Sequence, residues 1–230
     1  MSPDSSSRPL PFWLAGRPAN GEGQLDVCGP DGHHVASVSV PTDAQVEEAV
    51  AALASAQQEA QQLTLGQRAD ALAHVAARLL ERQEEIAALI TAENGKPIKW
   101  ARIEVTRASS VFRWAAEEAR RWSGDVQRLD TEAAAAGRLA LVKRVPKGPV
   151  LGIAPFNFPL NLVAHKVAPA LAVGAPILIK PAPATPLSAL VLGELLAETD
   201  LPPGMWSVLP VPNDRMPKLV ADPRLPPRGR

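Results

Sequence analysis

Hydrophobic residues in the middle of the chain recur at intervals of three and four, the spacing of amphipathic helices. Thr42 and Thr64 each stand three residues before a glutamine, a capping-box spacing that satisfies free amide groups at a helix start. Pro97 is the one proline in residues 42–145, and interior prolines break helices. The pattern predicts helices over 43–62, from 65 onward, over 84–93 and over 98–122.

The same spacing predicts which side of each helix faces the core. The charged run 117–121 is expected to be a solvated face of the last helix. The residues predicted to point inward are Val46, Ala49, Val50 and Leu53 in the first helix, Leu65, Leu72, Val75, Leu79 and Leu80 in the second, and Ile103, Val111, Phe112, Ala115 and Trp122 in the last.

Outside the helical middle, the hydrophobic pattern changes to short runs. Residues 35–40 alternate apolar and polar, which predicts a short strand, and residues 138–145 predict an exposed strand. After these residues, short continuous apolar runs, which predict buried strands, alternate with segments of helical spacing. This alternation of strands and helices predicts βαβ units, and hence an α/β fold with a parallel sheet covered on both faces. The strands are expected over 150–154, 177–179 and 205–209, and the helices over 160–173 and 187–199.

Polar residues follow two of these predicted strands. Asn157 stands between two prolines after the first strand, and Lys180 ends the second. Ligands of parallel sheets bind at the carboxyl ends of the strands. An amide and an ammonium at neighbouring strand ends are donors that would suit an anion or an oxyanion. No Gly-x-Gly-x-x-Gly phosphate loop accompanies them, so the usual dinucleotide fingerprint is missing.

Composition narrows the function classes. Lys and Arg number 24 and Asp and Glu number 24, giving a net charge of zero, which argues against a nucleic-acid partner. No apolar stretch approaches the ~20 residues of a membrane span, so no membrane partner is expected. The single cysteine, Cys28, fits a reducing compartment and allows no internal disulfide or cysteine-based metal cluster. We expect a cytoplasmic protein without a metal site.

Four motifs, in order and at plausible spacing, resemble the N-terminal half of the aldehyde dehydrogenase family over residues 12–225. They are AENGKP (92–97), GPVLGIAPFNFPLNLVAHKVAPALAVG (148–174), the block from Lys180-Pro181 to Thr185-Pro186, and Leu201-Pro202-Pro203-Gly204. The resemblance implies a partial Rossmann-like parallel sheet preceded by an N-terminal helical region. It also implies NAD(P)-dependent oxidation of an aldehyde substrate to a carboxylic acid through a cysteine thiohemiacetal.

Residue roles follow from the resemblance. Asn157 would donate its amide to the oxyanion, and Lys180 would hydrogen-bond the adenosine ribose. Many members that prefer NAD carry an acidic residue where this chain has Pro183. Without that carboxylate a 2′-phosphate is not repelled, so the cofactor could be NAD or NADP. The residues that would line the cofactor cleft are Ile153, Ala154, Pro155 and Phe156.

The resemblance divides the chain into successive parts. They are an N-terminal arm with a short strand (1–41), the helical part of the nucleotide-binding domain (42–124), a strand and linker of the oligomerisation type (125–147), a partial dinucleotide-binding βαβαβ domain (148–225) and an atypical tail (226–230). The family implies a homo-oligomer. The C-terminal strand that would join residues 138–145 is not in this sequence, which leaves oligomerisation open.

The end of the chain departs from the family pattern. Residues 226–230 read PPRGR, and Cys28 matches no nucleophile of the family. We therefore expect a truncated or frameshifted member that lacks the catalytic thiol and the general base, and that is inactive alone. The alternative is a non-catalytic module that binds a nucleotide or another subunit.

Overall fold

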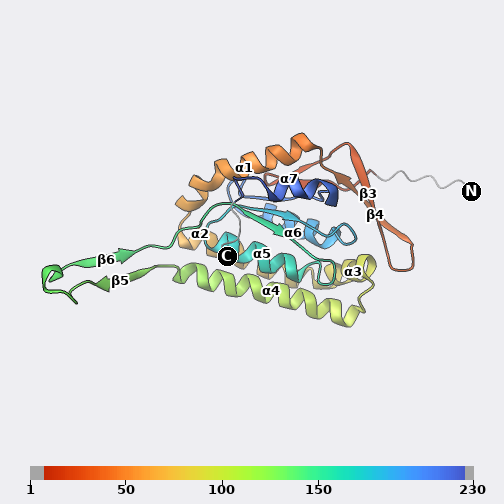
Figure 1. The fold of residues 1–230 in the computed structure, drawn as a ribbon. Coiled ribbons are helices and arrows are strands. Elements are labelled where there is room, and N and C mark those ends of the chain that lie inside the picture. The colour runs from red at the N-terminus through yellow and green to blue at the C-terminus, as the bar shows by residue number, and fades with distance from the viewer. Residues whose placement is uncertain (1–7, 226–230) are drawn as a thin grey trace, which may run out of the picture.

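A five-stranded sheet forms the centre of the structure, a computed structural model that describes residues 8–225 (Figure 1). The strand order is β2-β1-β9-β8-β7, so strands from both ends of the described chain meet in one sheet. The strands are β1 (Phe12–Leu14), β2 (Arg17–Ala19), β7 (Val150–Ile153), β8 (Ile177–Lys180) and β9 (Trp206–Val208).

The parallel half of the sheet confirms the predicted α/β fold. β7 pairs in parallel with β8, and β8 with β9. Helix α5 (Asn161–Ala172) connects the first pair and α6 (Leu187–Ala197) the second, which makes the βαβαβ arrangement. All four residues of β8 are buried, as expected for a strand covered on both faces.

The antiparallel half comes from the N-terminal segment and was not predicted. β1 pairs with β9 through Trp13 and Val208, and β2 pairs with β1 through a turn at Ala15 and Gly16. Both strands are three residues long, too short for an alternating pattern to reveal them. Their place in the sheet depends on contacts with residues almost 200 positions later, such as the Gly16 amide donating to the Trp206 carbonyl at 3.0 Å.

The helices form layers on both sides of the sheet (Figure 1). α1 (Asp43–Gln62) and the short α7 (Met216–Val220) lie on one side, and α5 and α6 lie on the other. α2 (Leu65–Glu81), α3 (Gln83–Asn94) and α4 (Ile98–Arg121) form a further layer that packs on α5 and α6. Both predicted capping boxes are formed, at Thr42 with Gln45 and at Thr64 with Gln67.

Two residues predicted to face the core do not. Leu80 is 50% exposed and Ile103 is 41% exposed. Leu80 follows the fully buried Leu79 and lies about 100° further round the helix. The buried face of α4 is built from small residues and Phe112, spaced three and four apart, and Ile103 lies off this stripe. Besides Phe112, the buried residues of α4 are Ala101, Glu104, Val105, Ala108, Ser109, Ala116 and Ala119.

Two antiparallel hairpins lie outside the central sheet. β3 (Gly23–Cys28) pairs with β4 (His34–Val40), the strand expected at 35–40. β5 (Asp125–Arg128) pairs with β6 (Leu139–Val142), and this hairpin projects away from the body (Figure 1). Short 3₁₀ turns are found at η1 (Ala133–Ala135) and η2 (Asn213–Arg215). The strand predicted over 138–145 is therefore confirmed with shorter bounds.

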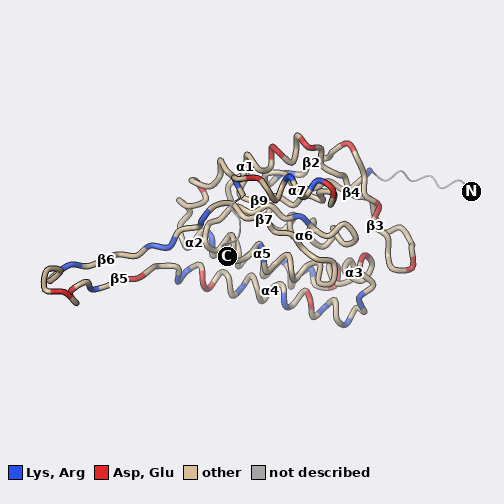
Figure 2. Tube along the Cα trace, viewed as in Figure 1, with Lys and Arg blue, Asp and Glu red and all other residues tan. Residues whose placement is uncertain are grey.

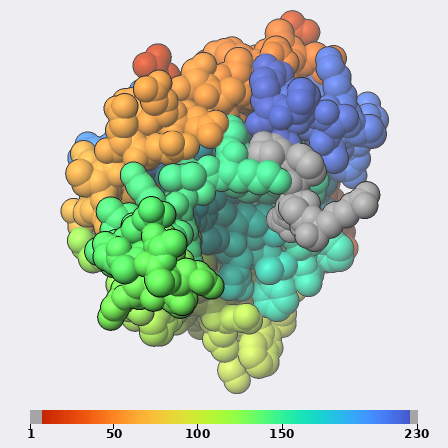
Figure 3. Space-filling view, turned by 60° about the vertical axis from the view of Figure 1, so that its left-hand side comes forward, coloured from red at the N-terminus to blue at the C-terminus, as the bar shows by residue number. Residues whose placement is uncertain are grey.

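The outer edge of β7 has no partner strand among residues 8–225. A pocket of about 530 Å³ lies beside it, between residues 146–151 and the side of α5 that carries Lys166 and Ala170. Figure 3 shows the surface hollowed beside the projecting hairpin, over the teal segments. In the same part of the chain, residues 8–225, no helix has the length and apolar character needed to cross a bilayer.

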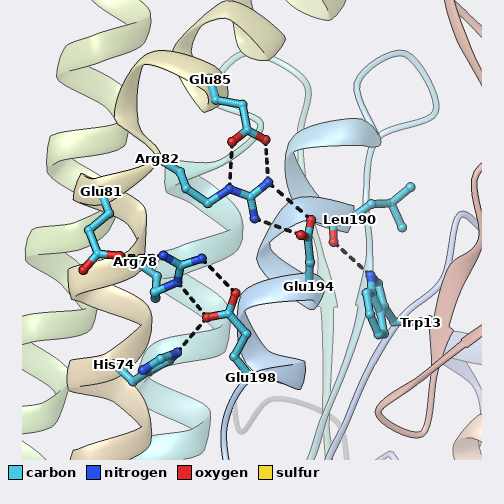
Figure 4. A network of polar contacts seen from close by, with 9 residues as sticks. All are labelled: Trp13, His74, Arg78, Glu81, Arg82, Glu85, Leu190, Glu194 and Glu198. Atoms are coloured by element: carbon cyan, nitrogen blue, oxygen red, sulfur yellow. Dashed lines mark hydrogen bonds and ion pairs between the residues drawn. The ribbon is translucent and has the colours of Figure 1, made fainter.

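A polar network fastens α2 and α3 to α6 (Figure 4). Arg78 binds Glu198 at the end of α6 with two hydrogen bonds of 2.7 and 3.2 Å, and His74 contacts the same carboxylate at 2.8 Å. Arg82 bridges Glu85 of α3 to Glu194 of α6. The Arg78 guanidinium holds the pKa of the Glu198 carboxyl below its usual range. This network joins the outer helical layer to the second crossover helix.

A buried carboxylate makes a further link between the same layers. Glu93, near the end of α3, accepts hydrogen bonds from the amides of Leu187 and Ser188 at 2.8 and 3.0 Å, and from the Ser188 hydroxyl. These amides belong to the first turn of α6, whose own N-cap residue, Pro186, offers no side-chain acceptor. Burial raises the pKa of the Glu93 carboxyl to about 7.

Glu93 is expected to make folding stability depend on pH. Because its pKa is raised in the folded state, the folded protein holds a proton that the unfolded chain has lost, so stability falls as pH rises from about 4.5 to about 7. A pKa raised from 4.5 to about 7 corresponds to a loss of up to about 3 kcal/mol in the free energy of unfolding. Urea unfolding of the wild type and Glu93→Gln across this range should show the loss in the wild type only. Glu48→Gln, an exposed position on α1, is the control, and parallel curves for wild type and Glu93→Gln would contradict the assignment.

Candidate active and cofactor site

The carboxyl ends of three parallel strands meet at one edge of the sheet. Ile153 of β7 stands beside Lys180 of β8 in register, and the Ala154 amide donates to the Lys180 carbonyl at 3.0 Å. The Lys180 ammonium donates to the Asn213 side-chain oxygen at 2.7 Å, and Asn213 follows β9. The three strand ends are thus tied together by hydrogen bonds.

Lys180 is a buried cation at this edge. It is 3% exposed, and burial lowers the pKa of its ammonium. Within residues 8–225 its one polar partner is the neutral Asn213 amide, with no carboxylate beside it. An ammonium has three N–H donors, so donors remain for the hydroxyl or phosphate oxygens of a ligand.

Asn157 lies on the turn that follows β7. Residues 155–158 are exposed and Pro159 is buried, so the turn stands out from the sheet edge. The side-chain amide of Asn157 makes no hydrogen bond to another residue of the described chain. Phe156 on the same turn is 61% exposed, and Ile153 presents a second apolar surface. An amide donor next to exposed apolar side chains can bind the polar and the apolar parts of a small molecule.

Residues at the end of α3 and in the loop before α4 hold this turn in place. Asn94 donates its side-chain amide to the Phe156 carbonyl at 2.8 Å. The next contact is made by Lys96, whose ammonium donates to the Asn157 carbonyl at 2.9 Å and lies 4.1 Å from the centre of the Phe158 ring. The backbone of Asn157 is therefore fixed while its side chain stays available.

Glu104 is the third residue that supports the Asn157 turn. This fully buried carboxylate pairs with Lys96 and accepts the amides of Leu160 and Asn161 at 3.0 and 3.1 Å. These two amides are at the start of α5, where the N-cap residue Leu160 supplies no side-chain acceptor. Glu104 thus caps α5 from outside, as Glu93 caps α6.

The predicted site residues are placed together by the structure. Ile153, Ala154, Pro155, Phe156 and Asn157 form one continuous segment, and Lys180 lies beside its start. Pro183 is half-buried in the loop between β8 and α6. Cys28 is exposed at the end of β3.

The supporting residues Asn94, Lys96, Glu104 and Asn213 were not predicted. A signal existed for Glu104, because it stands on the buried stripe of α4, three residues after Ala101 and four before Ala108. A charged residue at a core position requires a partner. The partner itself could not be read from the sequence, since the amides that Glu104 caps are 56 and 57 residues away.

Comparison with known proteins decides the family. Residues 17–226 match the family model described as "Aldehyde dehydrogenase family". The chain belongs to the aldehyde dehydrogenase family. A 3-sulfolactaldehyde dehydrogenase of Priestia megaterium is 41% identical over 174 residues, which cover 76% of this chain and 36% of that protein.

Solved aldehyde dehydrogenases have the same fold. The structure of an aldehyde dehydrogenase from Physcomitrella patens with the reaction product succinate is 42% identical, with a TM-score of 0.92, and the match covers 96% of this chain and 47% of that one. An NADP-dependent glyceraldehyde-3-phosphate dehydrogenase from Bacillus halodurans, complexed with NADP, is 32% identical with a TM-score of 0.89, over 94% and 47% of the two chains. The chain spans about half the length of these dehydrogenases.

Substitutions of Lys96 and Glu104 are expected to have strongly non-additive effects on the free energy of unfolding. Lys96→Met should lower the free energy of unfolding by about 3 kcal/mol, because it leaves a buried carboxylate unpaired. Adding Glu104→Gln should recover part of that loss, since the unpaired charge is then removed. Urea unfolding of both single variants and the double variant measures the coupling.

Lys99→Met, an exposed lysine on α4, serves as the control and should change stability little. Additive losses in the double variant would show that the two side chains act independently, contrary to the geometry.

Proposed function

We propose that the chain supplies the cofactor edge and the oxyanion donor of an enzyme that oxidises an aldehyde to a carboxylic acid with NAD or NADP. The proposal rests on two donors at the same sheet edge: the side-chain amide of Asn157, held on a fixed backbone after β7, and the buried ammonium of Lys180 at the end of β8. Family membership supports it. The chain spans about half the length of its solved relatives, so this is a proposal for the activity in which these residues take part.

Asn157 would act on the aldehyde carbonyl. When a nucleophile attacks the carbonyl carbon, negative charge develops on the oxygen, and the Asn157 N–H donates a hydrogen bond to it. A preorganised donor of this kind contributes roughly 10²-fold or more in rate. Because Lys96 and Glu104 fix the backbone of the turn, the donor needs little reorganisation as the charge develops.

The residues at the sheet edge fit a nicotinamide dinucleotide, which accepts hydride when bound. Lys180 has donors for ribose hydroxyls, and the apolar surfaces of Ile153 and Phe156 suit the rings of a nucleotide. Pro183 contributes no carboxylate that would repel a 2′-phosphate. The NADP complex of the Bacillus halodurans relative supports NADP, and NAD fits the same donors.

The substrate class we propose is a small aldehyde that carries an acidic group. The relatives described above support it, because 3-sulfolactaldehyde and the product succinate are both anionic. On this chain, Arg107 lies with its guanidinium carbon 5.7 Å from the centre of the Phe158 ring. It is exposed and is paired with no carboxylate in residues 8–225. A cation beside the Asn157 turn would favour an acidic substrate.

Nucleotide binding by the 230-residue chain tests the cofactor site. Calorimetric titration with NAD and with NADP should show saturable binding. Lys180→Met should weaken it about tenfold or more, because a charge-assisted hydrogen bond is lost. Lys218→Met, an exposed position on α7, is the matched control. Absence of binding of both nucleotides to the folded chain would refute the cofactor assignment.

A subunit contact is a second proposed role, carried by the β5–β6 hairpin. Val126 pairs with Leu141, and Leu139 shares their face of the hairpin. Leu141 is 82% exposed, and the other two are exposed as well. An isolated two-stranded hairpin is marginally stable in water. We infer that this apolar face packs against a second copy of the chain.

The hairpin proposal predicts self-association. Light scattering after size exclusion should find a dimer or larger oligomer for the wild type and a shift toward monomer for Leu141→Lys. Gln127→Lys places the same charge on the opposite face and should leave the oligomer unchanged. A monomeric wild type at all concentrations would contradict the proposal.

A further inference from the structure

A second pocket lies at the far end of α5 from Asn157. It has a volume of about 310 Å³ and is bounded by the start of α2, the end of α4 and the base of the β5–β6 hairpin. Val173, just after α5, lines it, whereas Asn157 precedes α5. One length of this helix, about 18 Å, separates the two places. The pocket is therefore distinct from the proposed active site.

The charged side chains of residues 8–225 that line this pocket are all positive. Arg68, Lys143 and Arg144 line it, and no aspartate or glutamate of residues 8–225 does. Arg144 is held at 3.4 Å by Asp125, an exposed pair of the kind that contributes little. Lys143 is exposed and has no partner in residues 8–225. Figure 2 shows this basic stretch as a blue segment where β6 joins the body.

The most informative residue of this pocket is Arg68. It is 7% exposed, its Nε atom is buried without a hydrogen-bond partner, and no carboxylate pairs with it in the described chain. Burial lowers the pKa of its guanidinium. A buried cation without a partner is strongly destabilising, so a structure that keeps one normally supplies an anion.

Trp122 provides a second orphan donor. Its indole N–H is buried and without a partner among residues 8–225, and the residue lines the same pocket. An indole nitrogen can only donate. Arg68 also lies in the first turn of the 17-residue α2, where the helix dipole is positive. Two side chains that line this pocket thus carry buried N–H donors with no acceptor among residues 8–225.

We propose that this pocket binds a tetrahedral oxyanion of the phosphate or sulfate type. The anion would accept hydrogen bonds from the guanidinium of Arg68 and the indole of Trp122, with Lys143 and Arg144 balancing its remaining charge. A guanidinium fork matches the oxygen spacing of such groups. The volume leaves room for an organic substituent on the anion as well.

Inorganic phosphate and sulfate, titrated separately in chloride buffer, are the probes. In the ¹⁵N spectrum of the 230-residue chain, the indole signal of Trp122, assigned with Trp122→Phe, and the Nε signal of Arg68 should shift with one saturable curve. Arg68→Gln should weaken binding about tenfold or more, and Lys143→Gln more modestly. Lys143 is an exposed position, so its variant keeps the test open if Arg68→Gln fails to fold.

Lys99→Gln, an exposed lysine outside the pocket, is the matched control and should bind as the wild type does. Shifts that follow ionic strength equally in chloride, or an unchanged affinity in Lys143→Gln and Arg68→Gln, would overturn the site. Acetate binding as tightly as phosphate and sulfate would overturn the tetrahedral assignment. The nucleotide titration uses other residues, so either proposal can fail alone.

Discussion

Two buried carboxylates outside the sheet hold the starts of both crossover helices. Neither α5 nor α6 begins with a residue that can cap it, since their N-cap residues are Leu160 and Pro186. Glu104 and Glu93 supply the missing acceptors from α4 and α3. Because each crossover helix begins shortly after a strand end, capping its first turn also fixes the segment before it. The geometry at Asn157 therefore depends on the outer helical layer.

The outer layer explains why the site residues can combine polarity with order. Lys96 is neutralised by Glu104 and still reaches the Asn157 carbonyl, so one ion pair both compensates a buried charge and positions a backbone turn. The arrangement avoids using the Asn157 side chain for its own support. That side chain stays free for a ligand, as does most of the donor capacity of Lys180.

The sequence predicted most of the elements that have long, periodic patterns. Local spacing and strand direction determine the helices of the middle, the βαβαβ segment and the gathering of residues 153–157 with Lys180. These features could therefore be predicted. The strands β1 and β2 could not, since three residues carry no period. Ile103 was misplaced because small residues form most of the buried stripe of α4, and Leu80 because it lies one position past the buried Leu79. The supports of Asn157 depend on pairings across more than 50 residues, which no local pattern encodes.

The external capping of α5 and α6 also bears on the order in which the chain can assemble during synthesis. The ribosome releases α3 and α4 before residues 160 and 187, so Glu93 and Glu104 exist before the amides they cap. Before those amides are in place, Glu93 lacks the donors of α6, and Glu104 has Lys96 as its partner. Docking of α5 and α6 on the helical layer therefore does two things at once: it compensates both buried carboxylates, and it holds the segment that carries the Asn157 turn.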